Sequence, residues 1–113
     1  MASRFTASGV SFVNTSGNAI CYGAPSYPNP SGCSIVLSCL VSNTAGDYAP
    51  VVTTSVFTDT SLTSVIAANI PLPSGASLEL IPNKLVLLSG QSLQTTVNPS
   101  GYIFVTTSVL EQF

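Results

Sequence analysis

Residues 77–111, SLELIPNKLVLLSGQSLQTTVNPSGYIFVTTSVLE, decide how this chain folds. They hold short apolar runs at 77–81, 84–88 and 102–110 and a weaker run at 92–97. The clusters between these runs contain Gly, Pro or Asn, whose backbone preferences favour tight turns. Because no helix of ordinary length fits between the clusters, the stretch predicts consecutive antiparallel strands.

The N-terminal half shows the same pattern of short extended segments. Residues 33–41 alternate with a period of two, which predicts a strand with one apolar face against the core. Residues 51–58 are rich in Val and Thr and suit a returning strand. Residues 9–13 and 19–22 flank a turn cluster and predict an N-terminal hairpin. The side chains expected on the core face of the strand at 33–41 are Cys33, Ile35, Leu37, Cys39 and Val41.

Residues 59–70 are open to two interpretations. Asp59 is suited to cap a short helix that ends before Pro71. The β-branched residues of the segment and the prolines that follow it favour an extended strand instead. With this strand the chain has about eight short strands. Such a count predicts an all-β fold, an antiparallel β-sandwich or barrel of the jelly-roll or immunoglobulin-like kind.

The sequence predicts a single domain, since 113 residues suffice for one core. Residues 1–8 are small and polar and predict an N-terminal arm, and residues 9–113 form the domain. A loop at 23–32 carries three prolines, which exclude a helix interior or a central strand. This stiff loop either presents Tyr22 and Tyr27 for recognition or packs them over one open end of the sandwich.

Charged residues are scarce. Two basic and four acidic side chains amount to 5% of the chain and a net charge of −2, against about 25% charged residues in an ordinary soluble domain. Uncharged polar residues must cover the outside, as on an extracellular protein or on a subunit hidden inside an assembly. With Arg4 and Lys84 as the only basic residues, nucleic acid is excluded as a partner.

The sequence also argues against a membrane partner and against export. No apolar run approaches the roughly 20 residues of a membrane helix. A basic segment followed by an apolar one, as in a secretory leader, does not open the sequence. We therefore expect a soluble protein that is made and kept on the cytoplasmic side.

The three cysteines, Cys21, Cys33 and Cys39, form an odd set. On one strand, Cys33 and Cys39 would lie about 20 Å apart, whereas a disulfide needs Cα atoms within about 7 Å. These two cannot pair, and Cys21 can join either of them. The alternative is a set of buried thiols in a reducing compartment. Because the chain has no histidine, the cysteines do not predict a metal site.

The sequence contains no catalytic set with suitable spacing. Without histidine, a Ser or Cys nucleophile lacks its usual base. The four carboxylates are far apart in the sequence, and no Gly-rich phosphate loop connects a strand to a helix. Glu79 either faces solvent or pairs with Lys84. We expect neither enzyme activity nor a cofactor.

From residue 69 onward the sequence resembles a group of small virion proteins of tailed bacteriophages. The resemblance is carried by NIPLPSGASLEL at 69–80, KLVLLSGQSL at 84–93 and VTTSVLE at 105–111. It extends more loosely to the two strands expected in the first half of the domain. Members of the group often have an acidic residue in the turn where this chain has Gln91. The loop at 23–32 has no counterpart in them.

The resemblance implies a non-enzymatic β-sandwich component of the virion. The function it implies is that of a capsid decoration (cement) subunit, made in the host cytoplasm and stabilising the particle as a homo-oligomer. Its partners would be the major capsid protein or other virion proteins. The alternatives are a neck or tail adaptor and a fibre-associated module that binds a host or a carbohydrate. Protein contacts are expected at Phe5, Tyr22, Tyr27, Pro28 and Tyr48.

Overall fold

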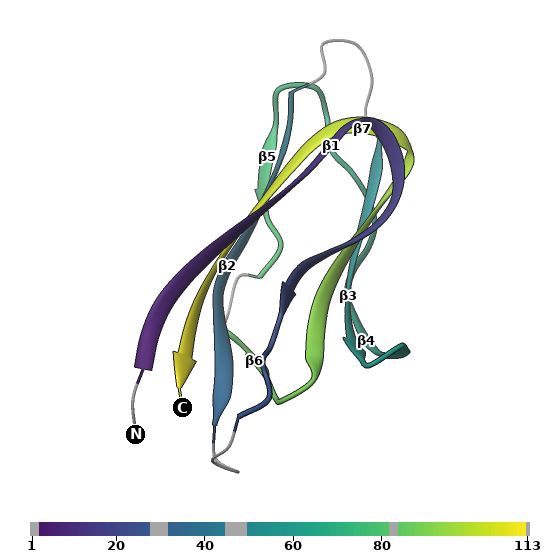
Figure 1. Ribbon diagram of the computed structural model, residues 1–113. Helices are drawn as coiled ribbons and strands as arrows, with labels where there is room; N and C mark the ends of the chain where they lie inside the picture. Colours follow the sequence, from purple (N-terminus) through teal and green to yellow (C-terminus); the bar gives the residue numbers. More distant parts are fainter. Residues whose placement is uncertain (1–2, 28–31, 45–49, 82–83, 113) are drawn as a thin grey trace.

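The structure is a computed structural model that describes residues 3–27, 32–44, 50–81 and 84–112, without the side chains of 14, 15, 99 and 100. These residues form antiparallel strands and no helix, which confirms the expected all-β sandwich (Figure 1). No helix in this part of the chain is therefore long and apolar enough to cross a membrane. The strands are β1 (Ser3–Gly23), β2 (Cys33–Asn43), β3 (Val51–Thr58), β4 (Ser61–Pro71), β5 (Ser77–Glu79), β6 (Leu85–Leu87) and β7 (Gln91–Gln112).

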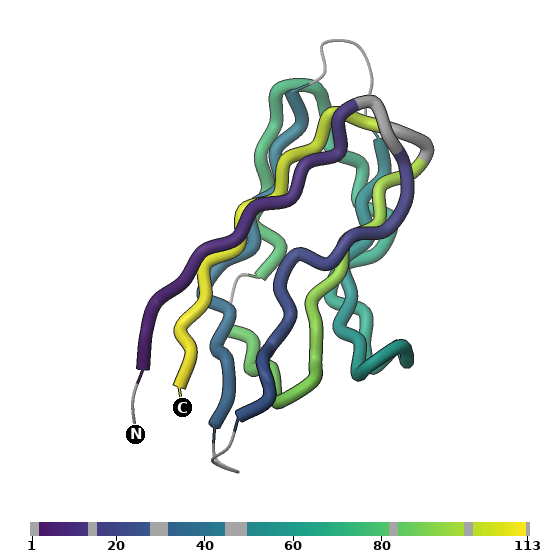
Figure 2. Tube along the Cα trace, in the orientation of Figure 1, coloured from purple at the N-terminus to yellow at the C-terminus, as the bar shows by residue number. Residues whose placement is uncertain are grey.

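The two longest strands, β1 and β7, hold the fold together. They pair antiparallel from Ser3 opposite Gln112 to Gly23 opposite Ser92. Both strands bend near the middle, so that the pair belongs to two layers (Figure 2). The first layer has the order β1–β7–β2, with β5 and β6 beyond β2. The second layer has the order β1–β7–β3–β4.

The bend contradicts two expectations from the sequence. Residues 9–13 and 19–22 do not form a hairpin, because both segments pair with β7. The cluster at 97–101 is not a turn either, since it lies inside the continuous strand β7. Register shifts on either side of Thr15 and a φ of 121° at Gly17 let the paired strands turn a corner together. The Gly and Asn residues there allow a bulged bend, and a bend of this kind favours the same residue types as a turn.

The C-terminal stretch does not fold as a meander of neighbouring strands. The sole hairpin between consecutive strands in the described residues is β3–β4, while β5, β6 and β7 each pair with β2. Residues 61–70 are extended, as the β-branched content indicated, and β4 follows a tight turn at residues 59 and 60. Asp59 adopts a φ of 55° in that turn, a conformation that Asp tolerates better than most residues.

The N-terminal arm expected at residues 1–8 differs from the structure. From Ser3 onward the chain belongs to β1, and Ser3–Ser8 lie opposite Gln112–Thr107 of β7. The small polar residues that indicated an arm belong to this edge strand. β1 has β7 as its one neighbour among the described strands, so its other edge carries open backbone groups.

A bulge in β2 changes which residues face the core. The register between β2 and β7 shifts between Val36 and Ser38. Before the shift, Ser34 and Val36 are buried, and after it Cys39 and Val41 are. The inserted residue reverses the alternation. The predicted core face, with Cys33 to Val41 on one side, is therefore correct only for the last two of its five residues.

The core lies between the two layers and is built from residues of both. Its fully buried large side chains include Val36 and Leu87 from the first layer and Val52 from the second. β7 contributes to both halves, through Leu93 before the bend and Ile103 after it.

Gly101 allows β7 to pass closely over the start of β3. A Cβ atom at this position would lie 2.8 Å from Cγ of Pro50 and 3.2 Å from Cγ1 of Ile103. The ring of Pro50 cannot swing away as a flexible side chain would. We predict that Gly101→Ala lowers the free energy of unfolding by about 1–3 kcal/mol, measured by urea denaturation.

Gly9→Ala is the matched control for this substitution. Gly9 also lies in a long strand of the pair, but its nearest atom is the Val105 carbonyl oxygen at 3.8 Å, an ordinary contact. The control is expected to leave stability unchanged or slightly raised. Equal losses in both variants would contradict the close-approach explanation.

Candidate functional site: the outer apolar row and the Glu111 network

The outer surface of the first layer carries an apolar row that crosses four strands. Phe5 of β1 lies opposite Leu110 of β7, Leu110 lies opposite Ile35 of β2, and Ile35 lies opposite Val86 of β6. Directly opposed residues of antiparallel strands point to the same face. Phe5 is 76% exposed and Val86 is 53% exposed, while the two central residues are half-buried. We call these four residues the outer row.

An open groove adjoins the outer row. Its volume is about 370 Å³, and Phe5 of the outer row is part of its wall. Leu37, the residue that β2 inserts at its bulge, lies in the same wall. Leu37 is half-buried in this wall, as is Ile35 in the outer row before the bulge. The groove is lined by Phe5, Thr6, Ala7, Leu37, Ser108 and Val109, none of which is charged.

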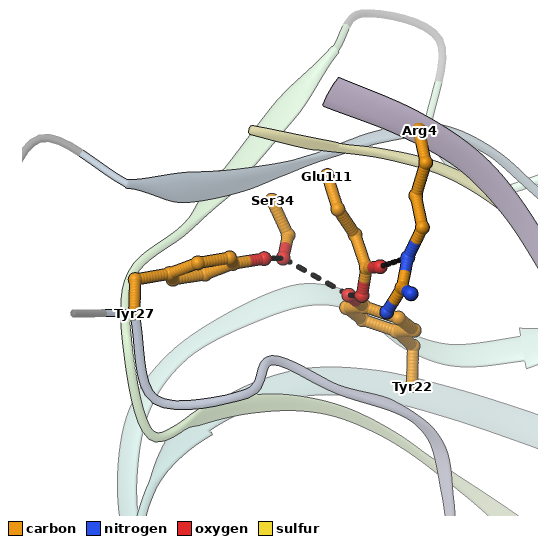
Figure 3. Close-up of polar contacts among 5 residues, drawn as sticks. All are labelled: Arg4, Tyr22, Tyr27, Ser34 and Glu111. Atoms are coloured by element: carbon orange, nitrogen blue, oxygen red, sulfur yellow. Dashed lines mark hydrogen bonds and ion pairs between the residues drawn. The ribbon is translucent and has the colours of Figure 1, made fainter. Parts of the chain in front are cut away.

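Beneath the outer row, a polar network fastens the two chain ends of the first layer. Glu111 of β7 is buried and points inward, whereas its neighbour Leu110 lies in the outer row. Oε1 of Glu111 accepts a hydrogen bond from Nε of Arg4 at 2.6 Å. Oε2 accepts one from the hydroxyl of Tyr22. Figure 3 shows the Arg4 side chain against the Glu111 carboxylate. Phe5 follows Arg4 directly in β1, so this ion pair fastens the part of the strand that carries Phe5.

Ser34 extends the network to the loop after β1. Its hydroxyl lies 3.0 Å from the Tyr22 hydroxyl and also bonds to the hydroxyl of Tyr27 (Figure 3). The backbone N–H of Tyr27 donates to Oγ of Ser89 at 3.0 Å, which ties the same loop to the turn before β7. We call Arg4, Tyr22, Tyr27, Ser34 and Glu111 the Glu111 network.

The electrostatics of the network favour an ionised Glu111. Burial by itself raises the pKa of this carboxyl, but the hydrogen bonds from Tyr22 and Arg4 outweigh it, and the net pKa lies below the ordinary value. Burial and the bond to Glu111 raise the pKa of Tyr22, which keeps the phenol a donor. The hydrogen bond to Glu111 raises the pKa of Arg4. The network therefore holds a buried carboxylate between two hydrogen-bond donors.

The structure separates the residues that the sequence predicted as contacts. Phe5 is exposed in the outer row, whereas Tyr22 and Tyr27 are each 9% exposed and meet at Ser34 in the Glu111 network. The two tyrosines thus pack over one end of the sandwich, which was the second of the two interpretations of the loop. Pro28 and Tyr48 lie outside the described residues.

Glu79 has a role that the sequence did not indicate. Its Oε1 accepts hydrogen bonds from the backbone N–H groups of Cys39 at 2.7 Å and Ile81 at 3.1 Å. Glu79 therefore completes the hydrogen bonding of the backbone beside β5. The sequence had predicted that it faces solvent or pairs with Lys84.

The remaining members of the outer row, Leu110, Ile35 and Val86, were missed by the sequence reasoning. Alternation alone assigned Ile35 to the core, because the bulge in β2 leaves no mark in the pattern of apolar residues. The signal that could have revealed the row is the excess of apolar residues on both faces of residues 33–41 and 102–110. A strand with one solvent-facing side normally alternates.

Comparisons with known proteins find similarity in fold but not in sequence. No protein-family model matches the sequence, and no curated protein sequence matches it either. Among solved structures, a chain of the acid-stable capsid of Helicobacter pylori bacteriophage KHP30 is similar over 98% of this chain and 87% of its own, with 14% identity and a TM-score of 0.56.

Capsid chains of infectious bursal disease virus are similar as well. A chain of its T=1 particles matches over 96% of this chain, with 14% identity and a TM-score of 0.56. A chain of the Gx strain matches over 98%, with 12% identity and a TM-score of 0.53. Our chain spans about a third of the length of these two, 31% and 33%. At such identities the likeness shows a shared β-sandwich fold.

The Glu111 network predicts a stability that depends on pH. Because the folded-state pKa of Glu111 is lowered, its contribution is present above the ordinary Glu value of about 4.3 and is lost as the pH falls through the folded-state value. We expect the wild-type free energy of unfolding to fall below about pH 4. Glu111→Gln should be destabilised by about 1–2 kcal/mol at pH 7 and should lose less than the wild type on acidification.

Arg4→Gln serves as the comparison for this pH series. The Arg4 side chain is 63% exposed and that of Glu111 only 5%, so solvent screens the ion pair on the arginine side. Arg4→Gln should cost less than Glu111→Gln at pH 7 and should keep part of the acid dependence through Tyr22. Chemical denaturation at a series of pH values measures both. Identical pH profiles for the wild type and Glu111→Gln would contradict the assignment.

Proposed function

We propose that this chain is a non-enzymatic structural protein of a virion that binds its neighbours through the outer row. The observation that carries the proposal is the apolar, uncharged strip from Phe5 to Val86 across four strands of one layer. Exposed contiguous apolar surface on a soluble domain marks a contact site. The fold supports the proposal, because the similar solved chains come from viral capsids.

The surface chemistry supports an assembled rather than a solitary state. Few charges are available to keep a free monomer soluble, with 5% of residues charged. β1 adds a second feature, since its outer edge has no neighbouring strand among the described residues. Long open edges are protected in monomers and used for pairing in assemblies. Both features suit a subunit that is covered by companions.

Within the virion, we assign the chain to capsid decoration, as a cement subunit present as a homo-oligomer. Its partner would then be the major capsid protein, and it would be made in the host cytoplasm. A decoration subunit needs one adhesive face and a fold that is stable by itself, and the outer row with the Glu111 network beneath it provides this combination. A neck or tail adaptor would use the same chemistry at another place in the particle, which electron microscopy of intact particles distinguishes.

The proposal predicts that polar substitutions in the outer row weaken assembly but not folding. Phe5→Ser and Val86→Ser remove exposed apolar side chains at the two ends of the row. Burying such a side chain contributes about 1.5–3 kcal/mol, so each variant should self-associate or bind particles at least about tenfold more weakly. Sedimentation velocity measures self-association, and cosedimentation with assembled particles measures binding. Urea denaturation should show changes within about 0.5 kcal/mol.

Leu62→Ser is the matched control, because Leu62 is 58% exposed on β4 of the other layer. It should leave association unchanged. A wild-type protein that stays monomeric and does not sediment with particles would contradict the proposal. Equal weakening by all three substitutions would contradict the assignment of the contact to the outer row.

The carbohydrate-binding alternative receives less support from the structure. Stacking on a sugar needs exposed aromatic faces. Tyr22 and Tyr27, which the sequence offered for this role, are buried and bonded to Ser34.

A further inference from the structure

The first half of β1 is the one long sheet edge among the described strands that carries no protective feature. β5 and β6 are three residues each, and β4 pairs with β3 through three register shifts and ends at Pro71. Short strands, bulges and prolines are features that prevent an open edge from pairing with another chain. Residues 3–13 of β1 contain no proline and no lysine, and their pairing with β7 is regular throughout.

The hydrogen bonding of the first layer shows which backbone groups of β1 face this open edge. The N–H of Thr44 donates to the carbonyl of Tyr102 at 2.9 Å, so the polar backbone groups of Tyr102 point toward the β2 side. Successive residues of an antiparallel ladder point to opposite neighbours. Ile103 therefore points toward β1, where it lies opposite Phe12. By the same alternation, the residues of β1 that present their N–H and C=O groups to the open edge are Phe5, Ala7, Gly9, Ser11 and Val13.

These five edge residues are uncharged and exposed on the outer face of the first layer. Phe5 is 76% exposed and Val13 is 51% exposed, and the three edge residues between them are small. Arg4 is the single charged residue in positions 3–13, and it is bonded to Glu111 within its own sheet. The edge thus offers backbone hydrogen-bonding groups and two large apolar side chains, with its one charge already paired.

We propose that β1 pairs antiparallel with β1 of a second copy, with Gly9 opposite Gly9 on a twofold axis. The first layers of the two copies then form one continuous sheet. In this register Phe5 of each copy lies opposite Val13 of the other, an aromatic and a β-branched residue of the kind that stabilise cross-strand pairs. Ala7 lies opposite Ser11, so only small side chains meet between the two apolar pairs. The interface is self-complementary, as a twofold contact must be.

The chemistry of the edge favours this register over its neighbours. Moving the axis to Ser8 places Phe5 opposite Ser11, so the exposed ring loses its apolar partner. With the axis at Gly9, the Arg4 residues of the two copies lie about ten positions, or about 34 Å, apart along the strands and do not repel each other. The two outer rows then lie on the same face of one sheet. The inference rests on the homo-oligomer of the proposed function and specifies its contact.

The contact is small enough to be reversible. Two strand edges bury less than the roughly 800 Å² per partner of a standard interface, so we expect a dimer with a micromolar dissociation constant. Sedimentation velocity of the purified wild-type chain measures it. A reductant keeps the free thiols of Cys21, Cys33 and Cys39 from linking copies. A chain that stays monomeric up to millimolar concentration overturns the proposal.

Amide hydrogen exchange of the wild-type chain, followed by NMR at a series of concentrations, locates the contact without any substitution. The amides of Ala7, Gly9 and Ser11 should become at least about tenfold more protected as the concentration rises through the dissociation constant. The amides of Ser8 and Val10, which point toward β7, should be protected at every concentration. A dimer in which the first three amides exchange at unchanged rates would place the contact elsewhere and overturn the proposal.

Gly9→Lys and Gly9→Glu test the register. Each places like charges directly opposite each other at the twofold axis and should weaken the dimer at least about tenfold, whereas their equimolar mixture should form a heterodimer. A side chain has room there, since a Cβ atom at Gly9 has its nearest neighbour at 3.8 Å. If a Gly9 variant fails to fold, the exchange pattern of the wild type decides the question.

Thr106→Lys is the matched control for the added charge. Thr106 lies opposite Gly9 on the same exposed face, but one strand in from the edge. The two added charges are then about three strand spacings apart, or about 14 Å, where salt screens them. This variant should dimerise as the wild type does. Equal weakening by Thr106→Lys and Gly9→Lys, or a mixture of the Gly9 variants that stays monomeric, would overturn the register.

Val86→Ser separates this inference from the proposed function. Val86 lies on β6, at the end of the outer row away from β1. Its substitution should leave the dimer intact while weakening the binding to particles. A wild-type dimer that does not bind particles contradicts the proposed function alone, and a monomer that binds them contradicts the edge pairing alone.

Discussion

The structure depends on the hydrogen-bonded pairing of β1 with β7 along their whole length. Every other strand joins one of the two layers by pairing with β7 or with a strand that does. Because the pair bends as a unit, it supplies strands to both layers without a loop between them. This geometry places the chain ends side by side at one end of the first layer, where the Glu111 network fastens them (Figure 1).

Two of the four carboxylates of this protein are used within the fold rather than over its surface. Glu111 bonds to Arg4 and Tyr22, and Glu79 bonds to two backbone N–H groups. In the described part of the chain, no buried side-chain nitrogen or oxygen lacks a hydrogen-bond partner. Buried threonines such as Thr54 and Thr95 bond to each other inside the core. Such a core tolerates many hydroxyls because each of them is satisfied.

The outer row and the groove beside it contain no charged residue. Along β7 the buried Glu111 of the network directly follows Leu110 of the outer row, and along β1 its partner Arg4 directly precedes Phe5. The interior network thereby borders the outer row along both strands. A change in the buried carboxyl should consequently be felt at the exposed row, through the strand that the two share.

The sequence by itself determined that the chain is all-β, because its Gly, Pro and Asn residues interrupt every apolar run before a helix of ordinary length is complete. It also determined the shortage of charge and the presence of an unpaired cysteine. Of the candidate site, it predicted Phe5 as a contact residue and placed Tyr22 and Tyr27 on or beside the same loop.

Only the tertiary structure decided which strands pair, where β2 is bulged and which residues of the site lie next to one another. Gly17 and the cluster at 97–101 have the composition of turns, and only pairing with a second bent strand makes them a corner. The one inserted residue in β2 sends Ile35 outward and Cys39 inward. Alternation cannot report such an insertion, since a period of two carries no information about register.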